Sequence, residues 1–209
     1  MNEFRYLGVI LDSTLSFRKH IKKVSNSVKF NLANFRQIRN SLTNTAALMF
    51  LHCMIFSHID YCFTSWALAC STALKPIESL YKKALKTLDK KPYSYHICII
   101  LKKYNFLSFE NFKVFKFACA TYKTLHGLAP PPLKEFIKNR TVRGMSTRAC
   151  DRGDLEIPHR RTTFGKNVLS VLGGEIWNGL PSTIRERPTF SVFKEKLKDW
   201  LKTNQKCVH

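Results

Sequence analysis

Apolar residues recur every three or four positions between Leu15 and Arg39, and this spacing constrains the fold more than any other feature of the sequence. The apolar positions are Phe17, Ile21, Val24, Val28, Phe35 and Ile38, with Asn31 in the remaining position of the repeat. Residues spaced in this way lie on one side of an α-helix. The pattern therefore predicts one long amphipathic helix.

Further helices are predicted along the chain. Their expected ranges are Thr43 or Asn44 to Ile59, Ala73–Leu88, Tyr95–Lys103, Ser108–His126 and 190–202, the last capped by Thr189. Gly127 and the prolines at 130–132 end the fourth of these helices. The helix from Thr43 or Asn44 to Ile59 is nearly uncharged, which indicates the buried centre of the domain.

The remaining segments are predicted to be short strands, turns and loops. Val9–Leu11 is an apolar run typical of a buried strand, and Asp12 and Ser13 supply turn and cap chemistry after it. Residues 138–166 are basic and rich in loop-forming residues, with a short strand expected around Leu155–Ile157. Trp177–Pro181 is expected to be a turn-like aromatic anchor. The predicted fold class is mainly α: a helical bundle with a short N-terminal β-strand and a loop-rich basic C-terminal region that ends in a helix.

The net charge of the chain is strongly positive. It contains 35 Lys and Arg residues and 14 Asp and Glu residues, which give a formal net charge of +21 at pH 7. Such a charge attracts polyanions at long range. Nucleic acid is the first candidate partner, and an anionic membrane surface is the second. Seven cysteines without a CxxC pair, and no signal peptide before Tyr6, indicate an intracellular protein. The longest apolar run, Ala46–Phe56, is too short to span a bilayer, so no membrane association is expected.

Two sets of cations are the candidate nucleic-acid contacts. The first set is Arg18, Lys19, Lys22, Lys23, Lys29 and Arg36, which fall largely off the apolar stripe of a helix without acidic residues after Asp12. The second set is Arg140, Arg143, Arg148, Arg160, Arg161 and Lys166, several of which alternate with hydroxyl side chains. Cations and hydroxyls donate to phosphates without reading base identity. The alternatives are an ordinary solvated helix face for the first set and an exposed basic loop for the second.

No catalytic or metal-binding constellation is evident. The Asp residues stand at 12, 60, 89, 151, 154 and 199 without an adjacent pair, and the aromatic-x-Asp-Asp signature of reverse transcriptases is absent. Asp151 and Asp154 are expected to form surface ion pairs with neighbouring arginines. His52, Cys53, His58, Cys62 and Cys70 lack the paired spacing of zinc ligands, so core packing is the preferred interpretation. Trp177, Phe190, Phe193 and Trp200 are expected in the core rather than stacked on bases.

A series of motifs resembles the reverse transcriptases of LINE-type (non-LTR) retrotransposons, in particular jockey-like and chicken-repeat-like elements. The first is Tyr6–Leu7–Gly8–Val9 with Leu11–Asp12, followed by Leu15–Ser16–Phe17 and His20–Ile21. The others, in order along the chain, are Phe56–Cys62 with Trp66, Leu74–Lys86, Tyr122–Pro130, Thr147–Arg148, Ile157–Pro158, Arg161–Thr162, Trp177–Pro181 and the helix at Phe193–Lys194. Glu78 and Lys83 depart from the commonest residues of their motif.

The resemblance implies the thumb and post-thumb part of such an enzyme. It implies a palm-edge strand at residues 1–14, a helical thumb-like region at 15–130 and a basic C-terminal region at 131–209. The expected function is at most non-specific binding of RNA, DNA or their hybrid, with no polymerase activity and no cofactor. Mg²⁺ would belong to an upstream palm domain, which is a further expected partner. The alternative function is a basic helical protein-interaction module without a nucleic-acid role.

Overall fold

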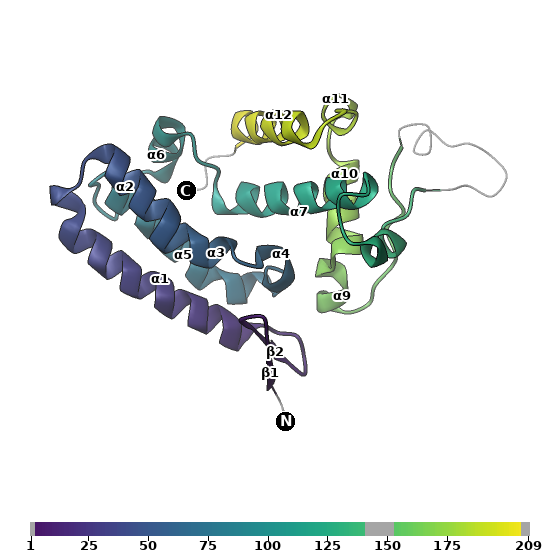
Figure 1. Ribbon diagram of the computed structural model, residues 1–209, viewed down its shortest axis with the longest axis horizontal. Coiled ribbons are helices and arrows are strands. Elements are labelled where there is room, and N and C mark those ends of the chain that lie inside the picture. The colour runs from purple at the N-terminus through teal and green to yellow at the C-terminus, as the bar shows by residue number, and fades with distance from the viewer. Residues whose placement is uncertain (1–2, 141–152, 206–209) are drawn as a thin grey trace. The chain divides into compact units, whose positions relative to one another are not determined.

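The computed structural model describes residues 3–140 and 153–205, which form two compact units with a division after Phe109. The first unit contains a β-hairpin and the helices up to α6, and the second contains Glu110–Gln205 (Figure 1). Helices dominate both units, and the described residues contain one two-stranded sheet. The predicted fold class, mainly α, is confirmed. The three segments expected from the resemblance remain a prediction.

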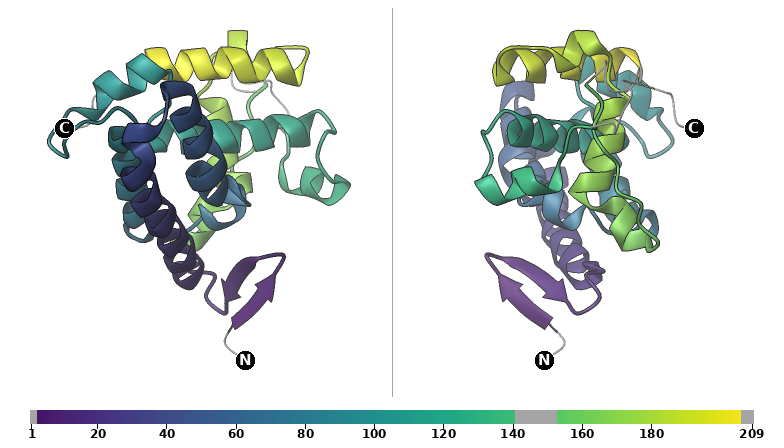
Figure 2. Two further views of the ribbon diagram at one scale, coloured as in Figure 1. Left: turned by 60° about the vertical axis from the view of Figure 1, so that its left-hand side comes forward. Right: turned by 90° about the vertical axis from the view of Figure 1, so that its right-hand side faces the viewer.

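The N-terminal strand is one arm of a hairpin. β1 (Glu3–Tyr6) pairs antiparallel with β2 (Val9–Asp12), and Tyr6 lies opposite Val9. Leu7 and Gly8 form the turn, with φ angles of 43° and 83°. Positive φ at both central residues is what a two-residue hairpin turn of type I′ requires. Tyr6–Val9 is therefore a turn and not a continuous strand. The expectation of a buried strand was also wrong, since only Val9 is buried (Figure 2 shows the hairpin beside the start of α1).

Asp12 connects the hairpin to the first long helix, as its predicted turn and cap chemistry requires. Its carboxylate accepts hydrogen bonds from the backbone N–H groups of Thr14 (3.1 Å), Ser16 (2.9 Å) and Phe17 (2.9 Å). The hydroxyls of Thr14 and Ser16 also donate to it, at 2.6 and 3.1 Å. Partial burial opposes ionisation, but these donors outweigh it and lower the pKa of Asp12 to about 2.

The helices of the first unit follow the predicted order. They are α1 (Arg18–Ile38), η1 (Arg39–Ser41), α2 (Asn44–Phe50), η2 (Leu51–Phe56), α3 (Ser57–Asp60), α4 (Phe63–Trp66), α5 (Ser71–Leu88) and α6 (Ile97–Tyr104). The hydroxyl of Thr43 caps α2 by accepting from the N–H of Ala46 at 3.2 Å.

α2, η2 and α3 form one continuous helix whose middle part is a π-helix. Ala47, Leu51, Ile55 and Ile59 are buried along it, four residues apart. In an α-helix, residues four apart are offset by about 40° around the helix axis. The wider turn of the π-helix reduces this offset, so the buried residues stay on one side. The predicted range is confirmed, but Met49 and Met54 are exposed, so this helix is buried on one side only.

The core of the first unit lies between α1, the α2–α3 helix and α5. Val28 and Phe35 of α1 and Ile77 and Leu85 of α5 are completely buried. Asn31, the polar member of the α1 stripe, is also buried. Its side-chain amide nitrogen donates to the carbonyl of Ser27 at 3.0 Å and lies 3.2 Å from Nε2 of His58. Its polarity is thus satisfied within the fold.

The second unit contains α7 (Phe109–Leu125), whose first residue closes the first unit, followed by shorter elements. These are η3 (Pro131–Phe136), α9 (Thr163–Asn167), η4 (Leu169–Gly173), α10 (Gly174–Asn178), α11 (Ser182–Arg185) and α12 (Phe190–Thr203). The ranges predicted for α7 and α12 are confirmed, and Thr189 caps α12 by accepting from the N–H of Val192 at 3.4 Å. The segment expected to be loop-rich contains the short helix α9.

The aromatic residues of the tail form the core of the second unit with Tyr122. The Tyr122 ring stacks on Phe193 with ring centres 4.3 Å apart, and its hydroxyl donates to the carbonyl of Arg187 at 2.9 Å. Trp177 and Phe193 are buried, as expected, whereas Phe190 and Trp200 are half-buried. Trp177 lies inside α10 and not in a turn.

Asn178, the residue after Trp177, connects α10 to the extended segment around Leu155. Its side-chain oxygen accepts from the backbone N–H of Leu155 at 2.8 Å, and its side-chain nitrogen donates to the carbonyl of Leu155 at 3.0 Å. Leu155 in turn forms an antiparallel bridge with Asn139, which is the structural counterpart of the short strand expected there. The Asn178 amide therefore holds the extended segment against α10. None of the helices in the described ranges is long and apolar enough to cross a membrane.

Candidate nucleic-acid interface

Four cations of α1 lie on one side of the helix. Arg18, Lys22, Lys29 and Arg36 are separated by four, seven and seven residues, which places them within about 40° of each other around the axis of an α-helix. All four are exposed. At a rise of about 1.5 Å per residue they extend over about 27 Å of helix.

Three of these cations line a groove between α1 and α5. The groove has a volume of about 460 Å³ and is bordered by Arg18, Lys22 and Lys29 of α1. Its other polar lining residues are Ser25, Asn26 and Thr72, and its apolar lining residues are Ile21, Ala73 and Pro76. Among the described residues, no carboxylate and no aromatic ring lines it. The groove therefore presents cations and short polar side chains, which suit an anionic backbone and offer no surface for base stacking.

The packing of α1 on α5 positions this groove. The two helices make the most extensive contact between helices of the first unit, and their buried apolar residues fix their separation. Pro76 lies in the second turn of α5 and has no backbone N–H. Ser25, Asn26, Thr72 and Pro76 were not singled out from the sequence, because their role depends on the pairing of two helices about fifty residues apart.

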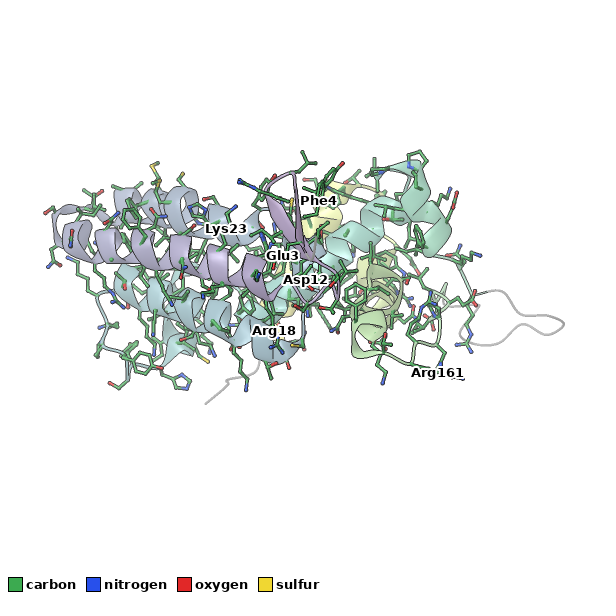
Figure 3. All side chains as sticks on the ribbon, turned by 90° about the horizontal axis from the view of Figure 1, so that it is seen from below. Glu3, Phe4, Asp12, Arg18, Lys23 and Arg161 are labelled. Carbon is green, nitrogen blue, oxygen red and sulfur yellow. The ribbon has the colours of Figure 1, made fainter. Side chains whose placement is uncertain are left out.

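Lys19 and Lys23 lie on a different side of α1 from the groove. Lys19 forms an ion pair with Glu3 of β1, and Nζ of Lys23 donates to the carbonyl of Gly8 at 3.3 Å. Figure 3 shows Arg18 and Lys23 projecting from opposite sides of the helix. The six cations predicted as one basic face are thus two groups. Four lie on the side of α1 that carries the groove, and three of these four line it. The other two, Lys19 and Lys23, lie beside the hairpin.

The second predicted set is only partly described. Arg143 and Arg148 lie outside the described residues. Arg140, Arg160, Arg161 and Lys166 are exposed in the second unit. Arg160 and Arg161 precede α9, whose first turn is capped by the hydroxyl of Thr162 accepting from the N–H of Gly165 at 3.0 Å.

Two arginines have structural roles that the sequence did not reveal. Arg39 is buried, and its guanidinium donates to the carbonyls of Leu88 (2.8 Å) and Leu42 (3.2 Å) and to the side chain of Asn44 (2.8 Å). Arg185 donates to the carboxylate of Asp154 at 2.9 Å, and both residues are buried. The expected surface ion pair of Asp154 was therefore wrong, and Asp151 lies outside the described residues.

The residues considered for a metal site are dispersed. His52, Cys53 and His58 are exposed, and Cys62 and Cys70 are half-buried, so their assignment to the core was wrong for the first three. The ring of His52 packs against Phe56 and Phe106 at the surface. Within residues 3–140 and 153–205, no three His, Cys, Asp or Glu side chains are placed to hold a metal ion together.

The structure thus defines a mainly helical protein with a cation-lined groove. No family model matches the sequence, and no solved structure matches the chain. The RNA-directed DNA polymerase from mobile element jockey of Drosophila funebris is 28% identical over 95 residues, which are 44% of this chain and 10% of the relative. The chain is therefore similar to a part of a LINE-type reverse transcriptase, and the match spans about a tenth of that protein.

Proposed function

We propose that the chain is the thumb and post-thumb region of a LINE-type reverse transcriptase, and that it binds the sugar–phosphate backbone of RNA, DNA or their hybrid without sequence preference. The proposal keeps the expected segments: a palm-edge element at 1–14, a thumb-like region at 15–130 and a basic region at 131–209. The similarity to the jockey polymerase supports the family origin.

The observation that carries the binding role is the groove between α1 and α5. Arg18, Lys22 and Lys29 converge on it, and none of the described residues that line it carries a carboxylate. A solvated helix face normally mixes both signs of charge, whereas α1 contains no acidic residue. Each cation that contacts a phosphate releases condensed counterions, so affinity is expected to fall steeply with salt.

We further propose that this chain has no polymerase activity by itself. Phosphoryl transfer by a palm-type enzyme needs carboxylates that together hold two divalent cations. Asp12 is engaged in its turn, Asp89 pairs with Lys103, and Asp154 pairs with Arg185. Carboxylates fixed in separate structural roles support the assignment of Mg²⁺ binding to a palm domain, which would be the partner of this chain in a complete enzyme.

The test is the salt dependence of binding to a fluorescent RNA–DNA hybrid, measured by anisotropy on the full chain. The variant Arg18→Gln/Lys22→Gln/Lys29→Gln should reduce the slope of log affinity against log salt by about 2 to 3, at about 0.7 to 0.9 per phosphate contact. The matched control, Lys102→Gln/Lys194→Gln/Lys196→Gln, removes the same charge from exposed positions on α6 and α12. It should leave the slope unchanged.

Two results would overturn the proposal. An equal reduction in both variants would show that diffuse charge, and not the groove, attracts the polyanion. An absence of binding at low salt would remove the nucleic-acid role and leave the protein-interaction module as the better hypothesis.

A further inference from the structure

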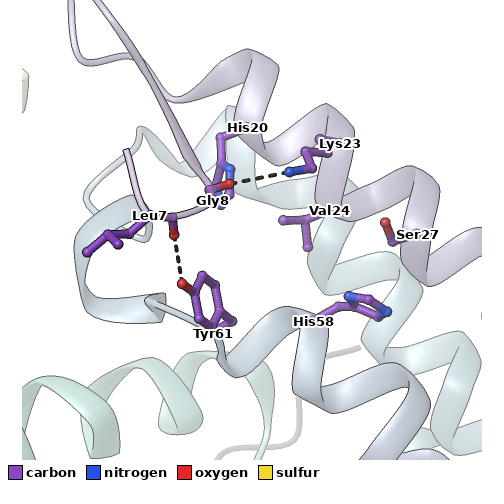
Figure 4. Close-up of a pocket in the computed structure, with 8 residues that line it drawn as sticks. All are labelled: Leu7, Gly8, His20, Lys23, Val24, Ser27, His58 and Tyr61. Atoms are coloured by element: carbon purple, nitrogen blue, oxygen red, sulfur yellow. Dashed lines mark hydrogen bonds between the residues drawn. The ribbon is translucent and has the colours of Figure 1, made fainter. Parts of the chain in front are cut away.

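A tyrosine with an exposed ring lies after the C-terminal end of α5, in the segment that leads to α6. Tyr93 is 75% exposed, and its hydroxyl makes no hydrogen bond to any described residue. The exposed ring of Tyr61 differs, because its hydroxyl donates to the carbonyl of Leu7 at 2.7 Å and so contacts the hairpin (Figure 4). Phe4 and Tyr6, also exposed, stack on each other. Within residues 3–140 and 153–205, Tyr93 has no such partner.

Two lysines of α5 lie against the Tyr93 ring. Nζ of Lys86 is 4.9 Å from the ring centre, and Nζ of Lys83 is 5.8 Å from it. Residues three apart lie on one side of a helix, so both ammonium groups approach the ring from α5. Each makes a cation–π contact. Because Tyr93 remains mostly exposed, the ring face turned away from α5 is open to solvent.

The backbone around Tyr93 is fixed by hydrogen bonds. The N–H of Tyr95 donates to the carbonyl of Pro92 at 3.1 Å, which closes a β-turn with Tyr93 at its second position. The ammonium group of Lys86 donates to the carbonyl of Tyr93. The N–H of Lys91 donates to the carbonyl of Lys86 at 2.9 Å and ties the segment to α5. An ordered turn therefore presents the ring, which reduces the entropic cost of binding.

Lys90 holds a strained conformation in the same segment. Its φ is 54°, in the left-handed region, and its N–H donates to the carbonyl of Thr87 at 3.1 Å. Gly or Asn is the usual residue at this position after a helix, because most side chains strain it. Strained residues of this kind cluster at functional sites. Here the strained residue is an exposed cation.

Four lysines belong to this end of α5 and its turn, at positions 83, 86, 90 and 91. We call them, together with Tyr93, the tyrosine–lysine cluster. None of the four forms an ion pair in the part of the chain that the structure describes. The carboxylate within the segment, that of Asp89, is only 5% exposed and pairs with Lys103. The cations of the cluster can therefore bind phosphate groups.

The tyrosine–lysine cluster continues the groove between α1 and α5. The groove is lined by the early turns of both helices, and Arg39 after α1 bonds Leu88 at the end of α5, so the helices run in the same direction. Lys83 lies within about 20° of Pro76 around the α5 axis, and Lys86 lies about 15 Å beyond Pro76 along it. A nucleic-acid strand that follows the groove covers this distance in about four nucleotides of about 3.4 Å each.

We propose that the open face of the Tyr93 ring stacks on an unpaired base of RNA or DNA, and that the lysines of the cluster bind the phosphates beside that base. Every base has a π-face, so such stacking is tolerant of sequence. The inference rests on the proposed function and specifies its substrate: a duplex bound in the groove, with a single-stranded extension at the end of α5.

The experiment measures the affinity of the full chain for an RNA–DNA hybrid with a single-stranded extension, by fluorescence anisotropy at one salt concentration. The comparison is the same hybrid with an abasic extension of equal length, which carries the same phosphates without bases. Wild type should bind the extension with bases about tenfold more tightly, as expected for one stacked base.

Two variants of Tyr93 test the ring itself. Tyr93→Leu should lose the preference for bases, and Tyr93→Phe should retain it because the ring is kept. Both changes are at an exposed position that folding tolerates. The matched control is Phe136→Leu on η3, which removes a ring that is 62% exposed in the second unit. This control should keep the wild-type preference.

The outcomes separate this inference from the proposed function. Equal affinity of wild type for the two extensions, or a preference that survives in Tyr93→Leu, would overturn the stacking role. The triple Gln variant of the groove would then still test the proposed function by its salt slope. No binding of either hybrid at low salt would overturn both.

Discussion

Replacing Arg39 by Met should destabilise the first unit by about 3 kcal/mol. Arg39 follows α1, and its guanidinium bonds three acceptors: the carbonyls of Leu88 and Leu42 and the side-chain oxygen of Asn44. Leu88 is the last residue of α5, so its carbonyl is one of those that lack a partner within the helix. The Arg39 side chain therefore supplies a hydrogen-bond donor to the C-terminal carbonyl of α5, although the two residues are 49 positions apart in the sequence.

The magnitude follows from two opposing terms. Each hydrogen bond to a charged group contributes about 1.5 to 3 kcal/mol, so three bonds give a gross loss of about 5 to 9 kcal/mol. Met keeps the apolar part of the side chain and avoids the cost of burying a guanidinium, which is several kcal/mol. The difference is about 3 kcal/mol, and it is dominated by the buried carbonyl of Leu88 left without a donor.

The assay is urea unfolding followed by the fluorescence of Trp66, the single tryptophan of the first unit, in a background with Trp177 and Trp200 replaced by Phe. Trp66 is completely buried and donates to the carbonyl of Tyr61 at 2.9 Å, so its emission reports this unit. The control is Arg36→Met, one turn earlier and exposed, which should change the free energy of unfolding by less than about 0.5 kcal/mol. A loss for Arg39→Met within about 1 kcal/mol of the control would refute the reasoning.

Three further changes test local features of the fold. The pKa of Asp12 is lowered to about 2 in the folded state, so its stabilisation is complete above about pH 4 and is lost as the pH falls toward 2. Because this carboxylate is largely solvated, wild type should lose about 1 kcal/mol more than Asp12→Asn between these limits, measured by urea unfolding. Asn178→Leu removes both hydrogen bonds to Leu155 and should cost about 2 kcal/mol in thermal unfolding of the second unit, and equal stability would contradict the pairing. Gly8→Ala should cost about 1 kcal/mol because its φ is 83°, whereas Gly179→Ala, at a φ of −79°, should be neutral or slightly stabilising in the same measurement.

The helices could be predicted because their signals are local. The range expected for the third helix begins two residues after α5 and ends with it at Leu88. Thr189 acts on a backbone group three residues away, so the start of α12 is also encoded in a short window. Apolar spacing, caps and proline breaks all operate within a few residues of the structure they determine.

The turn of the hairpin was missed because its sequence resembles a strand. Leu7 takes a positive φ without being Gly, Asn or Asp, the usual residues of such a turn. Arg39 and Asp154 were missed for a different reason, since their partners lie 49 and 31 positions away. Only the folded chain brings these residues into contact, and no periodic pattern in the sequence predicts the contacts.

The candidate groove could be predicted from the sequence only in part. The angular positions of Arg18, Lys22, Lys29 and Arg36 follow from 3.6 residues per turn. The sequence therefore already separates these four cations from Lys19 and Lys23. The opposite wall, formed by Thr72 and Pro76, required the pairing of α1 with α5. The sequence predicted the cations, and the fold determines which of them share a surface.

The charge of this surface is a cost to the free protein. Arg18, Lys22 and Lys29 are separated by about 6 and 10.5 Å along the axis, and no carboxylate borders their groove in the part of the chain that the structure describes. In water their mutual repulsion amounts to about 1 kcal/mol at low ionic strength, and it is screened when the Debye length falls to about 3 Å at 1 M salt. A bound polyanion removes the same repulsion. The triple Gln variant should therefore be more stable than wild type at low salt and equal to it at high salt, whereas the variant on α6 and α12 should show no such crossover. An identical salt response of the two variants would mean that the cations of α1 do not act as a group.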